Sequence, residues 1–123
     1  RIIDEMLRCC KKNAEVLCSV PFIVPYHAAP DDYYRWTKNG AEELFKDFSR
    51  VEVGIGAGPT SGMLWIFQEW LSLVLSFGNS TIKDVIFLIL MIVTFPIKYL
   101  DIVFEKFPNA EKLASGFYIY AKK

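Results

Sequence analysis

The chain has 123 residues, with 14 basic and 14 acidic side chains and a formal net charge of zero. This length fits one domain or a part of one, and the balanced charge argues against a nucleic-acid partner. Hydrophobic residues make up 53% of the chain, which is high for a short soluble protein, so we expect a partner or a membrane to cover some of the surface.

The chain begins in the middle of a helical pattern. Apolar side chains follow helical spacing from the first turn onward, at Ile2, Ile3, Met6, Leu7 and Cys10. The pattern ends at Asn13, a residue type that tolerates the left-handed conformation found at helix ends. The charged first turn does not fit a signal sequence. We therefore expect a cytoplasmic segment cut from within a larger domain.

The cysteines do not predict a metal centre. Cys9, Cys10 and Cys18 form no CxxC pair, and the chain has one histidine to join them. Their odd number also argues against a disulfide framework. We expect reduced thiols and no metal site.

Three strands and a short helix are predicted outside the most apolar region. Residues 15–24, EVLCSVPFIV, form an apolar run typical of a strand covered on both faces, as in a parallel sheet. A polar and aromatic loop, 25–37, precedes a helix at about 38–48, capped by Thr37 or Asn39. Residues 51–55 form the second strand. The last strand covers about 116–121, where aromatic and apolar residues alternate.

Two apolar segments, 63–77 and 81–107, predict a helical hairpin. Gly78, Asn79 and Ser80 provide a helix stop and a new cap, and Pro96 should kink or break the second helix. The longest uncharged stretch, 85–97, is shorter than the roughly 20 residues of a membrane span, so we expect no full crossing. The hairpin either packs on the domain or contacts a membrane surface. We also expect one apolar face, centred on residues 87–93, to stay uncovered in the isolated chain.

Residues 51–62, VEVGIGAGPTSG, imitate the start of a nucleotide or S-adenosylmethionine (SAM) site. Gly54, Gly56 and Gly58 follow an apolar strand, as in many cofactor loops. Such a loop needs a helix N-terminus against the ligand, whereas Pro59 and Gly62 interrupt the expected first turn. No strand ending in an acid follows at about 20 residues. We therefore interpret the segment as a glycine-rich strand exit.

The loop and its flanks resemble one protein family. Glu5, Arg8 and Lys11 or Lys12 match a helix pattern E-x-x-R-x-x-K. The pattern H-x-x-P-x-D-[YF]-x-R-x-T is filled at every position, by His27, Pro30, Asp32, Tyr33, Arg35 and Thr37. Later positions match at Gly58-Pro59 and at Ser115-Gly116-Phe117 with Lys122. In these features the chain resembles the C-terminal half of class I SAM-dependent methyltransferases of the methyltransferase domain 11 type.

The resemblance implies an α/β fold for residues 1–123, taken as a single domain. It would be a partial Rossmann-like methyltransferase sheet of strands five, six and seven, with an apolar helical hairpin insertion at 63–107. The last strand would lie between the other two and run antiparallel to them. The family binds SAM with its first four strands, which would precede this segment. We therefore expect the intact protein, but not this chain alone, to bind SAM.

The loop carries the candidate site residues. His27 either takes a proton from the methyl acceptor or caps a backbone carbonyl. Asp32 and Arg35 either brace the loop as a pair or bind a charged substrate group. The aromatic side chains of the loop either line the binding site of the acceptor or belong to the core; they are Tyr26, Tyr33, Tyr34 and Trp36.

Two functions of different class follow. The first is the substrate-side half of a SAM-dependent methyltransferase that acts on a hydrophobic or lipid-linked small-molecule acceptor. The second is a non-catalytic module that binds a membrane surface or a partner protein through the hairpin. We expect a small-molecule acceptor, no nucleic acid, and peripheral membrane contact or self-association through residues 63–107.

Overall fold

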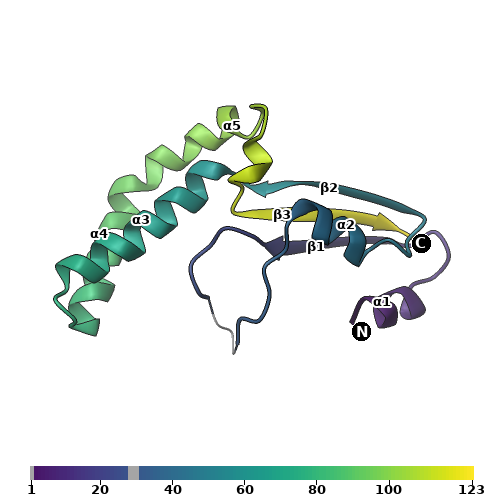
Figure 1. Cartoon of the computed structure of the whole chain (residues 1–123), viewed down its shortest axis with the longest axis horizontal. Coiled ribbons are helices and arrows are strands. Elements are labelled where there is room, and N and C mark those ends of the chain that lie inside the picture. The colour runs from purple at the N-terminus through teal and green to yellow at the C-terminus, as the bar shows by residue number, and fades with distance from the viewer. Residues whose placement is uncertain (1, 28–30) are drawn as a thin grey trace.

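A computed structural model describes residues 2–27 and 31–123. Its centre is a three-stranded sheet of β1 (Glu15–Pro21), β2 (Arg50–Ala57) and β3 (Gly116–Lys122), in the order β1-β3-β2 (Figure 1). β3 is antiparallel to both neighbours, and its Ile119 lies between Cys18 of β1 and Val53 of β2. The expected position and direction of the last strand are therefore confirmed, and the fold is mixed α/β.

Two short helices cover one face of the sheet. These are α1 (Ile2–Cys9) and α2 (Lys38–Leu44), and the core between them and the sheet contains the fully buried side chains of Phe45, Phe117 and Ile119. Thr37 caps α2 by accepting a hydrogen bond from the Gly40 amide at 3.1 Å, as predicted. α2 ends earlier than expected, because the chain turns at residues 45–47.

The expectation that residues 15–24 are covered on both faces is wrong for this chain. β1 ends at Pro21, lies at the sheet edge and pairs antiparallel with β3. Its Leu17 is 76% exposed, because α1 and α2 pack on the other face, where Val20 is buried. An unbroken apolar run does not indicate whether a strand pairs in parallel or antiparallel fashion. The parallel-sheet interpretation therefore had no independent support.

The apolar region forms the predicted hairpin. α3 (Pro59–Leu75) and α4 (Ser80–Thr94) pack side by side, and a 3-10 helix η1 (Phe95–Leu100) and a short α5 (Asp101–Phe104) continue α4. α3 ends at Leu75, two residues earlier than expected, and both Phe77 and Gly78 have positive φ in the turn that follows. Asn79 caps α4, as predicted. α4 gives way to η1 beside Pro96, which confirms the predicted break. A last 3-10 helix, η2 (Ala110–Lys112), leads into β3.

The hairpin projects from the end of the sheet where β2 ends and β3 begins (Figure 1). The predicted uncovered face is confirmed: Leu88, Ile89, Met91, Ile92 and Val93 are each between 43% and 67% exposed. The continuous helical stretch Ser80–Phe104 has 25 residues, and an 18-residue window within it has a mean hydropathy of 2.2. By length and composition alone, this stretch meets the requirement for a membrane span in the described part of the chain.

Candidate functional site

The loop after β1, which carries the pattern of the family resemblance, is fixed to the sheet at both ends. The Phe22 amide donates to the Ser115 carbonyl at 2.8 Å, and the Trp36 amide donates to the Pro21 carbonyl at 2.9 Å. The loop therefore leaves and returns at the same end of the sheet, beside the base of the hairpin (Figure 1). Pro30 of the loop pattern lies outside the described residues.

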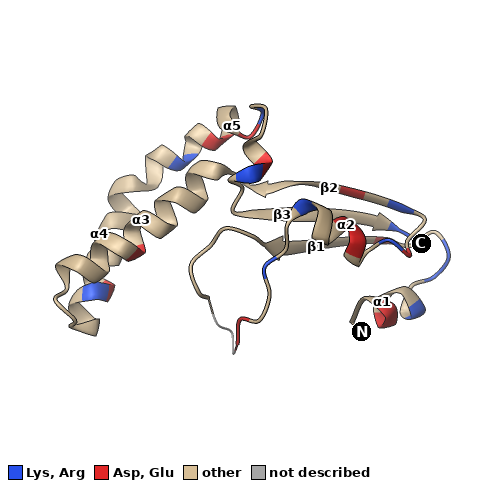
Figure 2. Cartoon of the chain, viewed as in Figure 1, with Lys and Arg blue, Asp and Glu red and all other residues tan. Residues whose placement is uncertain are grey.

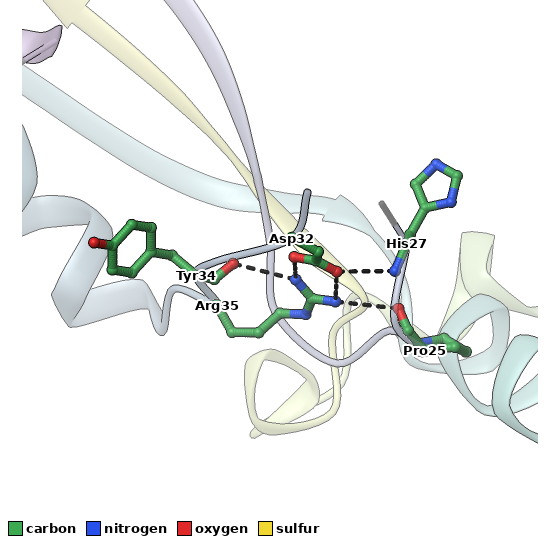
Figure 3. Close-up of polar contacts among 5 residues, drawn as sticks. All are labelled: Pro25, His27, Asp32, Tyr34 and Arg35. Atoms are coloured by element: carbon green, nitrogen blue, oxygen red, sulfur yellow. Dashed lines mark hydrogen bonds and ion pairs between the residues drawn. The ribbon is translucent and has the colours of Figure 1, made fainter. Parts of the chain in front are cut away.

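Asp32 and Arg35 form a two-pronged ion pair within this loop. Two guanidinium nitrogens of Arg35 donate to the two carboxylate oxygens of Asp32. Arg35 also donates to the carbonyls of Pro25, at 3.1 Å, and Tyr34, at 3.2 Å, while the His27 amide donates to Asp32 at 2.9 Å (Figure 3). These contacts join the two sides of the loop. The pair is thus engaged with the protein itself, the arrangement expected of a brace.

The electrostatics of the pair favour its charged form. The Arg35 side chain, followed by the His27 amide, lowers the pKa of Asp32 from 3.8 to about 2 by hydrogen bonding to the carboxylate. Asp32 in turn raises the pKa of Arg35 above its usual value. The Asp32 side chain is 8% exposed and that of Arg35 is 29% exposed, so solvent screens the pair only in part. At neutral pH the brace is fully ionised.

The His27 ring points away from the ion pair and toward the hairpin. Figure 3 shows the imidazole directed away from Asp32 and Arg35. Its ring lies edge-on to that of Trp65 in α3, with 5.6 Å between the ring centroids. His27 is exposed, so its ring remains accessible to a substrate. The backbone of His27 therefore supports the brace, while its side chain faces outward.

The aromatic residues of the loop are not gathered around one pocket. Tyr26, Tyr33 and Tyr34 are each at least 70% exposed. Trp36 instead packs against the core, with its ring 5.8 Å from that of Tyr34. The Tyr33 hydroxyl donates to the Asp31 carboxylate at 3.0 Å. Within the described residues, the rings of Tyr33, Tyr34 and Trp36 follow one another from the surface to the core and do not enclose a pocket.

An apolar groove of about 860 Å³ opens on the other side of α3, and it was not predicted from the sequence. Ile23, Met63, Trp70 and Phe104 are among the side chains that line it. The apolar α3 residues that line the groove recur at helical spacing: Pro59, Met63, Ile66, Phe67 and Trp70. The apolar spacing on α3 could be recognised in the sequence. The residues after η1 that form the other side of the groove could not. Trp65 lies about 200° around the helix from both Met63 and Phe67, so His27 and the groove are on opposite sides of α3.

The glycine-rich segment is a strand exit followed directly by a helix. The expectation that Pro59 and Gly62 interrupt the first helical turn is wrong: α3 begins at Pro59, and Gly62 is buried within it. Proline suits the first helical position, because its missing amide would have no partner there. A Cβ on Gly62 would lie 2.6 Å from Ser115 Oγ, which explains the glycine by close packing.

The N-terminus of α3 is occupied by a carboxylate of the chain itself. Asp101 accepts hydrogen bonds from the Thr60 amide at 2.7 Å, the Ser61 amide at 2.9 Å and the Ser61 hydroxyl at 2.6 Å. A Cβ on Gly58 would lie 2.3 Å from the Asp101 carboxyl carbon, so the glycine admits this side chain. The amides that a cofactor phosphate or carboxylate would use are therefore already bound. Among the described residues, the first turn of α3 and the glycine before it therefore do not fit a SAM site.

Comparisons of the chain with family models, with curated proteins and with solved structures find no match.

Proposed function

We propose that the chain is the acceptor-side half of a SAM-dependent methyltransferase. The observation that carries the proposal is the order of the sheet, in which the last strand lies between two earlier strands and runs antiparallel to both. This is the order that the family resemblance implies for strands five, seven and six. Local propensity does not produce such an order, because both neighbours of β3 are distant in sequence.

The outer edge of β1 supports the same proposal. β1 pairs with β3 on one side, and its opposite edge is the edge of the sheet. In the proposed intact protein, this edge would pair with the fourth strand, and the preceding strands would hold SAM. When bound there, SAM would supply the methyl group. This chain would supply the surface that receives and orients the acceptor.

Within that surface we assign His27 the role of general base. Its accessible ring could take the proton that an acceptor hydroxyl or amine loses, because an imidazole nitrogen is the most frequent general base in enzymes. The Asp32–Arg35 brace would be a positioning element, since it holds the His27 backbone in place. The apolar groove would accommodate a hydrophobic portion of the acceptor, and its location across α3 requires an acceptor long enough to reach around the helix.

The proposal is tested on the protein encoded by the complete gene. We expect the coding sequence upstream of Arg1 to contain an acidic glycine-rich loop and a later ribose-binding acid. The intact protein should bind SAM in a titration calorimeter and transfer a radiolabelled methyl group to a component of a lipid extract. His27→Ala should lower kcat by at least about 100-fold, the usual contribution of a general base, and leave SAM binding unchanged. An unrelated domain upstream would overturn the proposal.

A second candidate is supported by the exposure of the hairpin. A non-catalytic module that binds a membrane or a protein would use the same apolar helices, which the sheet leaves uncovered. This candidate predicts neither SAM binding nor methyl transfer by the intact protein. The same calorimetric titration therefore separates the two functions.

A further inference from the structure

The two helices of the hairpin place their polar side chains against each other. The Gln68 amide nitrogen of α3 donates to Thr94 Oγ1 of α4 at 2.6 Å, and both residues are buried. Ser72 and Ser76 are at most 3% exposed, and their hydroxyls bond to carbonyls of their own helix. An amphipathic pair in water would turn its polar residues outward. This seam instead has the small and hydrogen-bonding residues that are common between helices in lipid.

The outer surface of the hairpin is apolar on opposite sides. On α4, the exposed residues 88, 89 and 91–93 together span about 200° of the helix circumference. On α3, the exposed residues 63, 66, 67, 70 and 73–75 span a similar arc facing away from the seam. Phe77, at the tip, is 95% exposed. A protein partner or a second copy would cover one side of this unit, whereas hydrocarbon covers all sides.

Few charged residues lie on the helices of the hairpin, as Figure 2 shows. Near the tip, Lys83 pairs with Glu69 across the two helices at 2.7 Å, and each side chain is about one-third exposed. Residues 85–97 carry no charge, and they rise about 20 Å along the helix. The charged residues of the sheet, α1 and α2 lie at the other end of the molecule (Figure 2).

We propose that the α3–α4 hairpin inserts into the hydrocarbon region of a lipid bilayer and leaves the sheet in water. Insertion into lipid accounts for both the polar residues buried in the seam and the apolar residues on opposite outer sides of the hairpin, whereas a protein surface accounts for only one of those sides. Pairing of Glu69 with Lys83 would reduce the penalty of carrying these two charges into the membrane, while the exposed carboxylate of Asp84, beside Lys83, adds to that penalty. This inference does not rest on the methyltransferase proposal.

The test is flotation of the purified chain with phosphatidylcholine vesicles, prepared with and without phosphatidylglycerol. We expect the chain to float with both, and high salt to leave flotation unchanged, because the attraction is apolar rather than electrostatic. Ile89→Lys and Ile92→Lys should each lower the vesicle partition coefficient at least about tenfold. The matched control is Leu17→Lys, which places the same charge on an exposed apolar residue of the sheet and should float as the parent does.

A second measurement locates the inserted surface. A chain with Trp36→Phe and Trp65→Phe retains Trp70 alone, and lipids with brominated acyl chains should quench its fluorescence. A chain that retains only Trp36 should not be quenched. Circular dichroism checks that every variant is folded.

Three outcomes would overturn the inference. The parent chain could remain with the unbound fraction, or Trp70 could escape quenching while the protein floats. Alternatively, the parent could form a dimer in detergent-free buffer that Ile89→Lys dissociates, without binding vesicles. The last result would assign the surface to a second copy.

Discussion

Removal of the Asp101 carboxylate is expected to destabilise the junction between the hairpin and the sheet. The side chain is 8% exposed and accepts three hydrogen bonds from the first turn of α3. Loss of a helix cap costs about 0.5–2 kcal/mol, and loss of a charge at the helix N-terminus costs about 0.3–1 kcal/mol more. The buried Thr60 amide would also lose its partner, at about 1–3 kcal/mol. We therefore expect Asp101→Ala to lower the free energy of unfolding by about 2–4 kcal/mol, since these contributions overlap.

The assay is urea denaturation followed by circular dichroism, in a mild detergent that keeps the hairpin dispersed. We expect the urea concentration at the unfolding midpoint to fall, while the dependence of the unfolding free energy on urea concentration stays the same. Asp101→Asn retains one oxygen acceptor and should lose roughly half as much. The matched control is Asp47→Ala, which removes an exposed carboxylate and should change stability by less than about 0.5 kcal/mol.

A double-mutant cycle with Gly58 makes the prediction specific. Gly58→Ala places a Cβ 2.3 Å from the Asp101 carboxyl carbon and should displace the cap. The backbone of Gly58 has φ of −74°, which alanine tolerates, so the substitution should cost little once Asp101 is alanine. Additive losses in the double variant would refute the proposed contact. An Asp101→Ala variant with the same urea midpoint as the parent chain would also refute the proposed contact.

Three further predictions concern the sheet and the loop. The Asp32–Arg35 brace should be complete above pH 3.8 and break as the pH falls through about 2, because the folded pKa of Asp32 is lowered; an NMR titration midpoint near 3.8 would contradict this. Gly54→Ala should swing the Tyr118 ring outward, because the new Cβ would lie 2.4 Å from it, while SAM binding by the chain stays undetectable by calorimetry. Micromolar SAM binding by the parent chain would contradict our interpretation of the glycines. Asn13→Ala should lower stability by about 1 kcal/mol by chemical denaturation, since Asn13 has φ of 65°, whereas Asn13→Gly should not.

Local signals in the sequence predicted the hairpin well. Gly78 and Asn79 supply a helix end and a cap through their own backbone and side-chain chemistry, and Pro96 removes an amide from α4. Each of these effects acts within one turn of the residue that causes it. The strand order required the family resemblance, because β3 pairs with strands far away in the chain.

The long-range contact that caps the N-terminus of α3 could not be predicted from local sequence patterns. Asp101 caps α3 from about 40 positions farther along the chain, and nothing near Gly58 identifies it as the partner. The buried seam did leave a signal, since Gln68, Ser72 and Ser76 recur at four-residue spacing. From the sequence alone, a polar stripe on such an apolar helix would be assigned to the solvent-exposed face, and only the structure shows that the stripe is buried.

The central position of β3 has a consequence for how the protein is made. A ribosome synthesises the chain from its N-terminus, so β1 and β2 emerge long before residues 116–122 exist to join them. The hairpin, at residues 59–104, also leaves the ribosome before the sheet can close. Its apolar surface is therefore presented to chaperones or to a bilayer before the sheet is complete. A stop codon a few positions before residue 116 would release β1 and β2 with no strand to connect them.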